Sequence, residues 1–179
     1  MVERKAVSGM VYWTRFEVED GCVTLAANEK GVCYIGLAED SEERMKEWLF
    51  KQTGVVEMRE DTDRLAASAV EIKKYLSGEA QQFDSPIDCI GTPFQLTVWK
   101  ALRAIPYAKT VTYSEIAEQI GRPAAVRAVA SAIGKNPLLL MTPCHRVIAK
   151  DGSLSGYRDG PQWKEHLIRL EQNTLGSSY

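Results

Sequence analysis

The sequence predicts a fold of two parts, a small α/β domain over residues 1–84 and a mainly α-helical domain over residues 85–179. β-rich segments separated by turn signals fill the first forty residues, and a series of helix-start signals follows residue 92. Between them, the stretch QQFDSPIDCIGT (81–92) holds turn residues with little periodicity, which places the domain boundary there.

The first part should contain an antiparallel sheet. Val11–Val18 is β-rich, and Asp20-Gly21 is a hairpin turn signal. Apolar residues then alternate over residues 23–27, and residues 32–37 predict a third strand after a second turn.

Two helices are expected after these strands. Asp40 and Glu43 have the spacing of a capping box, and the helix that they would open should stop at Gly54. Apolar residues at helical spacing over residues 65–76 predict a second helix that ends at Gly78. No Gly-rich phosphate loop and no nucleophile with a base is evident in this part.

Three helices are predicted in the first half of the second part. The TPFQ sequence at residues 92–95 combines an N-cap, a proline at the first helical position and a capping-box glutamine, and its helix ends before Pro106. The TYSE sequence at residues 112–115 is a second capping box, whose helix Gly121 closes. The third helix should run over residues 123–134.

The second and third of these helices have the outline of a helix-turn-helix, joined by the tight turn IGRP. A plain αα-corner has the same outline, so topology alone leaves both possibilities open. The surface of the third helix favours contact with a nucleic-acid groove, since it is small and uncharged around a single Arg127. These small residues are Ala124, Ala125, Ala128 and Ser131.

Composition excludes several classes. The chain has 179 residues, ordinary hydrophobic content of 45%, no long apolar run, and no apolar segment in residues 1–10 that would indicate a signal peptide. The net charge is −2, but residues 1–88 hold 11 Lys and Arg against 18 Asp and Glu, whereas residues 89–179 hold 11 against 6. An anionic partner should therefore bind the second half.

The four cysteines do not form a metal-binding pattern. None of them belongs to a CxxC pair, so a zinc site is not expected, and Cys22, Cys33 and Cys89 are interpreted as buried reduced thiols. Cys144 is different, because it is followed at once by His145 in the sequence PCHRV (143–147).

A thiol with a neighbouring histidine suggests an activated nucleophile. Adjacent residues diverge in helices and strands, so Cys144 and His145 could cooperate only through a turn or a bridging water. A carboxylate usually holds the second nitrogen of such a histidine, and Glu171 lies at the edge of the apolar stripe of a helix predicted over residues 161–173. An ordinary boundary glutamate is the alternative. His166 is interpreted as structural.

Residues 83–172 resemble the O6-alkylguanine-DNA alkyltransferase family. The residues that carry the resemblance are Gly91-Thr92-Pro93-Phe94-Gln95, Val98-Trp99, Ile105-Pro106, Thr112-Tyr113, Arg127-Ala128-Val129, Asn136-Pro137, PCHRV (143–147), Gly156-Tyr157 and Lys164…Leu167…Leu170-Glu171. The first part of the chain matches the family only in size and strand-rich character.

The resemblance implies DNA repair by single-turnover transfer of the alkyl group from O6-alkylguanine in duplex DNA to the protein itself. Cys144 would be the acceptor, His145 would reach it through a water, Glu171 would orient His145, and Asn136 would brace the turns around the site. O4-alkylthymine is a further possible substrate. Because a thioether is not a leaving group, one chain would repair one lesion.

The family's mode of DNA binding implies roles for further residues. The helix-turn-helix, of winged-helix-like type, would enter the minor groove, and Arg127 would fill the space of the flipped nucleotide. Tyr113 would turn the phosphate and bind the base, the carbonyls of Cys144 and Val147 would accept from its exocyclic amine, and a backbone N–H near Arg158 would hold O6. Tyr157 completes the residues expected to bind substrate.

Further expectations and alternatives accompany the resemblance. No cofactor and no metal are expected. The expected partner is double-stranded DNA containing O6-alkylguanine, and no membrane association is expected. The protein should act as a monomer in the cytoplasm, at the nucleoid. The closely spaced cysteines of zinc-containing regulatory relatives are missing, which suggests a stand-alone repair form. Asp159 stands in GYRDG where many relatives have a small residue, so the range of alkyl groups stays open.

The alternatives to an alkyltransferase are a non-catalytic alkylated-DNA-binding protein, a cysteine hydrolase and a plain helix-turn-helix regulator.

Overall fold

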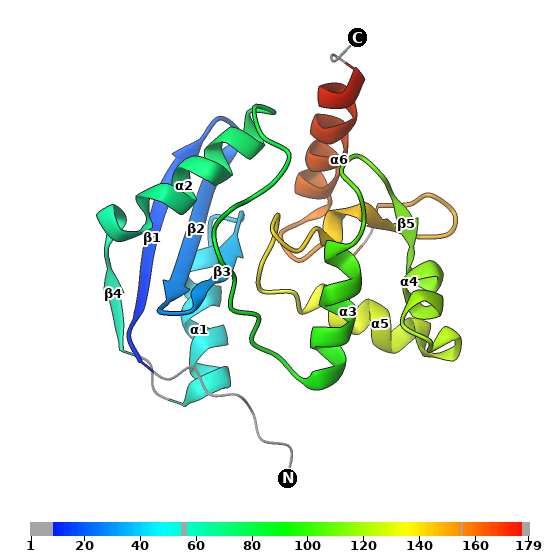
Figure 1. Cartoon of the computed structure of the whole chain (residues 1–179), viewed down its shortest axis with the longest axis horizontal. Helices are drawn as coiled ribbons and strands as arrows, with labels where there is room; N and C mark the ends of the chain where they lie inside the picture. Colours follow the sequence, from blue (N-terminus) through cyan, green and yellow to red (C-terminus); the bar gives the residue numbers. More distant parts are fainter. Residues whose placement is uncertain (1–8, 55–56, 155, 177–179) are drawn as a thin grey trace. The chain divides into compact units, whose positions relative to one another are not determined.

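The computed structural model describes residues 9–54, 57–154 and 156–176 and divides the chain into two compact units. The N-terminal unit is Met1–Thr92 with Pro137–Leu139, and the C-terminal unit is Pro93–Asn136 with Leu140–Tyr179. Most of their elements are labelled in Figure 1. The predicted class, an α/β unit followed by a mainly helical one, is confirmed, whereas the boundary between residues 84 and 85 stays a prediction. The prediction that residues 1–10 do not form a signal peptide falls mostly on residues that the structure does not describe.

The N-terminal unit is built on a mixed sheet with the strand order β3-β2-β1-β4 (Figure 1). Its strands are β1 (Val11–Val18), β2 (Gly21–Asn28), β3 (Gly31–Gly36) and β4 (Met58–Glu60). The first three pair antiparallel as the turn signals predicted. The short β4 pairs parallel to β1 and was not predicted, because three residues are too few to show an alternating pattern.

Two helices, α1 (Ser41–Thr53) and α2 (Thr62–Leu76), cover opposite faces of this sheet. Successive side chains of a strand point to opposite faces. On β1, Trp13 lies 5.3 Å from the ammonium of Lys46 in α1, and the neighbouring Tyr12 lies 4.1 Å from the guanidinium of Arg64 in α2. Coverage on both sides explains why β2 is buried continuously over residues 22–26.

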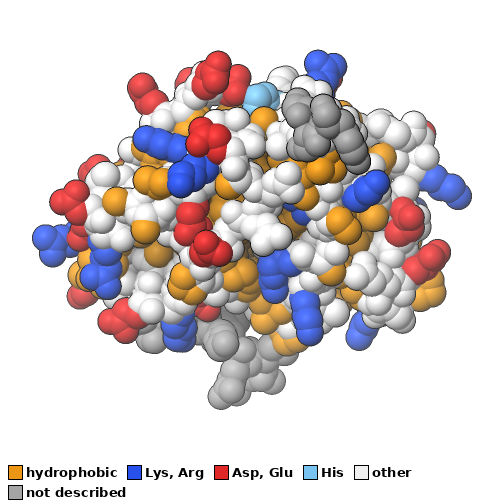
Figure 2. Space-filling model, turned by 45° about the horizontal axis from the view of Figure 1, so that its top comes forward, with side chains coloured by type: hydrophobic (Ala, Val, Ile, Leu, Met, Phe, Trp, Pro, Cys, Tyr) orange, Lys and Arg blue, Asp and Glu red, His pale blue; other side chains and the backbone are white. Residues whose placement is uncertain are grey.

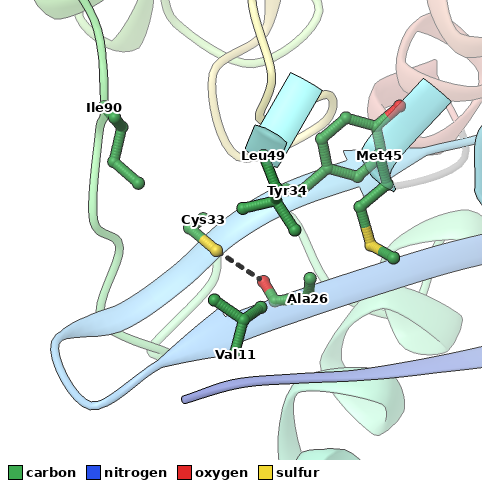
Figure 3. Close-up of a cluster of buried hydrophobic side chains, with 7 residues drawn as sticks. All are labelled: Val11, Ala26, Cys33, Tyr34, Met45, Leu49 and Ile90. Atoms are coloured by element: carbon green, nitrogen blue, oxygen red, sulfur yellow. Dashed lines mark hydrogen bonds between the residues drawn. The ribbon is translucent and has the colours of Figure 1, made fainter. Parts of the chain in front are cut away.

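The α1 side of the sheet holds a compact apolar cluster (Figure 3). Its buried members are Val11, Ala26, Cys33, Tyr34, Met45, Leu49 and Ile90. Burial raises the pKa of Cys33 to about 12, and its thiol donates to the carbonyl of Ala26. Cys33 and Cys22 are free and buried as predicted, whereas Cys89 is only half-buried, so that part of the prediction is wrong.

The start of α1 corrects the predicted capping box. Asp40 occupies the N-cap position, but its side chain makes no capping hydrogen bond and instead accepts from Nε of Arg44 at 2.8 Å. An arginine one turn away therefore takes the carboxylate that the pattern assigned to the backbone. The helix ends at Gly54 as predicted, with a backbone φ of 79°.

Two extended segments run beside β3 in the N-terminal unit. Val32 donates its N–H to the carbonyl of Pro86, and Ile35 donates to the carbonyl of Pro137, both at 2.8 Å. The second contact belongs to Pro137–Leu139, a short insertion between two stretches of the C-terminal unit. The edge strand β3 is thus paired on both sides.

The C-terminal unit consists of helices and one very short sheet (Figure 1). Its elements are α3 (Pro93–Arg103), β5 (Val111–Thr112), α4 (Tyr113–Gln119), the 3-10 helix η1 (Pro123–Ala125), α5 (Val126–Gly134), the 3-10 helix η2 (Cys144–Arg146), β6 (Val147–Ile148) and α6 (Pro161–Gly176). The strands β5 and β6, which were not predicted, pair parallel. Indole N–H of the buried Trp99 donates to the carbonyl of Ala132 and fastens α3 to α5.

The surfaces of the two units carry different charge patterns. On the face drawn in Figure 2, both units carry acidic and basic side chains, with more uncharged surface between them on the C-terminal unit. Within the described ranges, no helix has the length and apolar character to cross a membrane.

Candidate active site

Cys144 opens the 3-10 helix η2, directly after a buried turn. The turn contains Leu140 in a left-handed conformation, with a φ of 69°, so the chain bends sharply just before the thiol. The thiol is 4% exposed. The 3-10 turn is the kind of feature that the adjacent pair Cys144 and His145 was expected to need.

Asn136 lies beside the thiol and forms hydrogen bonds to it and to the bend. Its amide nitrogen donates to Sγ of Cys144 at 3.2 Å and to the carbonyl of Thr142 at 2.8 Å. One buried side chain thus bonds both the acceptor sulfur and the backbone just before it. The bracing role that the resemblance implied for Asn136 stays a prediction.

The thiol lies in an environment of opposing effects. Burial raises the pKa of Cys144, while the hydrogen bond from Asn136 and the positive charges of Arg158 and Lys164 lower this pKa. The nearby Asp159 raises it. Burial prevails, so the free protein holds Cys144 as a thiol at neutral pH and needs a base to form the thiolate.

His145 and Glu171 form a buried pair. Nε2 of His145 lies 2.5 Å from Oε1 of Glu171, and both side chains are at most 1% exposed. A neutral ring that donates Nε2–H to this carboxylate has Nδ1 as its acceptor nitrogen. Burial lowers the pKa of His145 although Glu171 opposes this effect, so the ring is neutral at pH 7 and can accept a proton.

The carboxylate of Glu171 is also held by groups that the sequence did not reveal. Nε of Arg146 donates to Oε2 at 3.0 Å, Nη2 donates to Oε1 at 3.1 Å, and the backbone N–H of Ala108 donates to Oε2 at 2.7 Å. Arg146 also donates to the carbonyl of Ile105 at 2.6 Å. Glu171 is therefore an anchored buried anion, and the alternative of an ordinary boundary glutamate does not fit its surroundings.

Lys164 is a second site residue that sequence reasoning missed, although it was part of the family motif. It is 1% exposed, and its ammonium lies 5.8 Å from the ring centre of Tyr113. Burial lowers the pKa of Lys164, and the nearby Cys144 opposes that shift. Lysine side chains are almost always exposed, so nothing in the sequence indicated that this one is buried. Its place in the family motif was the one signal that could have identified it.

The residues expected to bind the base come from three segments. Tyr113 is the first residue of α4. The backbone at Gly156, which has a φ of 83°, passes close to this tyrosine, because a Cβ on Gly156 would lie 3.1 Å from the Tyr113 hydroxyl. Val147 and Tyr157 are buried. The carbonyl of Cys144 accepts from Val147 N–H within η2, which leaves one of its two lone pairs for another donor.

The guanidinium of Arg158 points into the site. It donates to the carbonyl of Asn136 at 2.8 Å and to Asp159 Oδ1 at 3.0 Å. Its side chain is 17% exposed, whereas that of Asp159 is fully buried. The sequence suggested a role only for the backbone near Arg158, so the side-chain contact with Asn136 is a further observation.

The helix-turn-helix is present in the same unit. Thr112 and Glu115 form the predicted capping box of α4, and the segment expected to be one helix from Pro123 begins as η1 and continues as α5. Arg127 is exposed on α5. Among the small residues around it, Ala124, Ala128 and Ser131 are exposed and Ala125 is half-buried.

The described part of the chain contains no cluster of three His, Cys, Asp or Glu side chains that could hold a metal ion.

The fold and the site together define a class of protein in which a helix-turn-helix unit carries a buried cysteine beside an anchored histidine–glutamate pair. Comparison with known proteins narrows this class.

Both halves of the chain match one family. Residues 93–173 match the 6-O-methylguanine DNA methyltransferase, DNA binding domain, and residues 11–89 match the 6-O-methylguanine DNA methyltransferase, ribonuclease-like domain. The inducible methylated-DNA–protein-cysteine methyltransferase of Bacillus subtilis is 45% identical over 90% of each chain. A methylated-DNA–protein-cysteine methyltransferase of Methanosarcina barkeri is 39% identical over 92% of this chain and 99% of its own.

Solved structures agree with the sequence comparison. The crystal structure of Mycobacterium tuberculosis O6-methylguanine methyltransferase is 36% identical and matches with a TM-score of 0.80 over 92% of this chain and 94% of its own. The structure of the M. tuberculosis protein in complex with DNA matches with a TM-score of 0.78 at 35% identity, over 93% and 94% of the chains. The chain belongs to the 6-O-methylguanine DNA methyltransferase family.

Proposed function

We propose that this protein repairs DNA by transferring the alkyl group from O6-alkylguanine in duplex DNA to the sulfur of Cys144. The observation that carries the proposal is the buried Cys144 thiol, bonded by Asn136 and adjacent in sequence to the His145–Glu171 pair. The named activity of relatives that match nearly the whole chain supports the same conclusion.

The reaction is a single displacement at the alkyl carbon. His145 takes the thiol proton through a bridging water, with Glu171 stabilising the imidazolium that forms. The thiolate of Cys144 then attacks the alkyl carbon, so that the S–C bond forms as the bond from carbon to O6 breaks. Guanine keeps the electron pair and takes up a proton. The thioether product does not release the alkyl group, and each chain therefore acts once.

Access to the lesion requires that the nucleotide leave the base stack. In the proposed complex the exposed Arg127 of α5 occupies the vacated space, and the small surface of Ala124, Ala128 and Ser131 fits the minor groove. Tyr113 turns the phosphate and bonds a ring nitrogen of the base, while the carbonyls of Cys144 and Val147 accept from its amine.

The remaining contacts complete the proposed pocket. Tyr157 lines it, and a backbone N–H near Arg158 holds O6 of the guanine. We place the protein in the cytoplasm at the nucleoid, where it would meet duplex DNA, and we expect it to act as a monomer. O4-alkylthymine is proposed as a second substrate.

The test is incubation with excess duplex that contains one O6-methylguanine, followed by mass spectrometry of the intact protein and its peptides. We expect one methyl group per chain, on the peptide with Cys144, and no recovery of activity. Cys144→Ala should bind the methylated duplex without transfer. Repeated turnover, or methylation of Cys22, Cys33 or Cys89, would refute the mechanism, and binding without transfer by the unmodified protein would favour the non-catalytic alternative.

A further inference from the structure

Asp159 is a fully buried carboxylate that has no role in the proposed transfer. Removing a carboxylate from water is unfavourable unless charged and hydrogen-bonding partners replace the water. Its negative charge also raises the pKa of Cys144, which opposes formation of the thiolate. A buried acid that works against the nucleophile therefore requires another explanation.

The contacts of Asp159 give that explanation, because they fix the orientation of Arg158. Nε of Arg158 lies 3.0 Å from Oδ1 of Asp159 and Nη2 lies 3.5 Å from Oδ2, so one edge of the planar guanidinium faces the carboxylate. The remaining nitrogen, Nη1, donates to the carbonyl of Asn136 at 2.8 Å. Rotation of the guanidinium would break contacts at both ends.

Asn136 in turn contacts the sulfur. Its amide donates to Sγ of Cys144 at 3.2 Å and to the carbonyl of Thr142 at 2.8 Å. A continuous set of hydrogen bonds thus leads from Asp159 through Arg158 and Asn136 to the acceptor atom. All four residues belong to the C-terminal unit.

We propose that Asp159 and the side chain of Arg158 are positioning residues that hold the backbone of Asn136 so that its amide stays bonded to the sulfur of Cys144. The role goes beyond the backbone contact that the family resemblance suggested near Arg158. It rests on the proposed function only in taking Cys144 as the alkyl acceptor.

Two variants separate positioning from the simple effect of charge. Arg158→Lys keeps a positive charge near Cys144 but loses the planar fork that reaches both Asp159 and Asn136. Asp159→Asn has nearly the same shape and removes the negative charge that disfavours the thiolate. If charge alone matters, the first variant should behave like the unmodified protein and the second should react faster. If positioning matters, both should react more slowly.

The experiment measures two rates across pH 6 to 10. One is methyl transfer from O6-methylguanine duplex, and the other is alkylation of Cys144 by iodoacetamide, followed at its peptide by mass spectrometry. We expect Asp159→Asn, Arg158→Lys and Arg158→Gln each to slow transfer roughly ten- to hundredfold, as lost orientation of a reacting group does. The pH midpoint of the iodoacetamide reaction should rise in Arg158→Lys, because this variant keeps the positive charge and loses only the orientation of Asn136, whose hydrogen bond favours the thiolate.

The double variant Arg158→Gln/Asp159→Asn should be no slower than the slower single variant, because the two side chains act as one unit. Asp151→Asn is the matched control, since Asp151 is an exposed acid in the same loop whose carboxylate caps the N–H of Ser153. It should leave both rates unchanged. Arg158 is partly exposed, so its variants test the proposal even if replacement of the buried Asp159 prevents folding.

Four results would overturn the inference. They are unchanged transfer or an unchanged pH midpoint in Arg158→Lys, faster transfer by Asp159→Asn, and losses that multiply in the double variant. The iodoacetamide measurement does not depend on DNA. If the unmodified protein fails to accept methyl from DNA but the midpoint of the iodoacetamide reaction still rises in Arg158→Lys, the proposed function fails and the positioning role stands.

Discussion

The imidazole of His145 and the carboxylate of Glu171 are joined by a 2.5 Å contact between Nε2 and Oε1, with both side chains withdrawn from solvent. Glu171 also accepts from Arg146 and from the backbone of Ala108, so its position does not depend on His145. The carboxylate can therefore orient the imidazole and stabilise its protonated form. It also balances the buried charge of Arg146, and these two roles can be separated experimentally.

Replacement of either partner should slow methyl transfer. In His145→Gln the base is lost, so we expect slower single-turnover transfer at pH 7 that recovers in part near pH 9.5, where more of the thiol ionises unaided. Glu171→Gln should show the same kinetic defect. The double variant should be little worse than either single one, because members of one unit are not additive. Multiplied losses would show that the two residues act independently.

Stability should separate the two variants. Glu171→Gln leaves the guanidinium of Arg146 without its charged partner, and breaking a buried pair in this way costs about 3–5 kcal/mol. His145→Gln leaves that pair intact and should cost much less. Urea unfolding of both variants checks the difference. Equal losses would mean that the contact between Arg146 and Glu171 contributes little to the fold.

The stability of the protein should decline on mild acidification. Burial lowers the pKa of His145 in the folded protein, whereas an ordinary histidine in the unfolded chain titrates near about 6.5. The unfolded state binds this proton more readily, so stability is fully present above that value and falls as the pH drops through it toward the lower folded pKa. Urea unfolding between pH 5 and 7.5 measures the effect. His145→Gln should reduce this dependence, while His166→Gln, which changes the other histidine, should leave it in place.

Local patterns predicted the strands and helices well where both partners of an interaction lie close in the sequence. The capping box of Thr112 and Glu115 formed because each group reaches the other's backbone within one turn. The same pattern at Asp40 failed because Arg44 competes for the carboxylate. The three-residue strand β4 was missed because its pairing with β1 is a tertiary contact without a local signal.

The candidate site was predicted in part for the same reason. Cys144 and His145 are adjacent, and helical spacing placed Glu171 at the border of an apolar stripe. The partners that anchor Glu171 are 25 residues away at Arg146 and 63 residues away at Ala108, and no periodicity connects such positions. Arginine side chains are mostly exposed, yet that of Arg146 is buried because the carboxylate of Glu171 is buried with it.

Gly31 should be intolerant of any side chain. Its φ is 143°, and a Cβ would overlap the carbonyl of Pro86 and lie 2.8 Å from the nitrogen of Ile87. Gly31→Ala should therefore lower the free energy of unfolding by more than about 2 kcal/mol, through strain and loss of the contacts beside β3. Gly134→Ala is the control, because nothing lies within 4 Å of a Cβ there and alanine favours the helix. Thermal unfolding that is equal for the two variants would contradict the prediction.

Arg127 should matter for repair in duplex DNA and much less for a free base. The side chain is exposed on α5 and is proposed to fill the gap left by the flipped nucleotide, whose unstacking costs a few kcal/mol. Arg127→Ala should slow transfer from a methylated duplex markedly, while reaction with free O6-benzylguanine, if the pocket accepts it, should change little.

Lys135→Ala is the matched control, since it removes an exposed positive charge just beyond the end of α5. If only the charge of Arg127 mattered, both variants would lose duplex transfer equally and addition of salt to the unmodified protein would reproduce the loss. A loss on both substrates would instead show that Arg127 supports the fold of the site. The expected outcome, a defect confined to duplex and to Arg127, requires a side chain that acts only when a nucleotide must leave the stack.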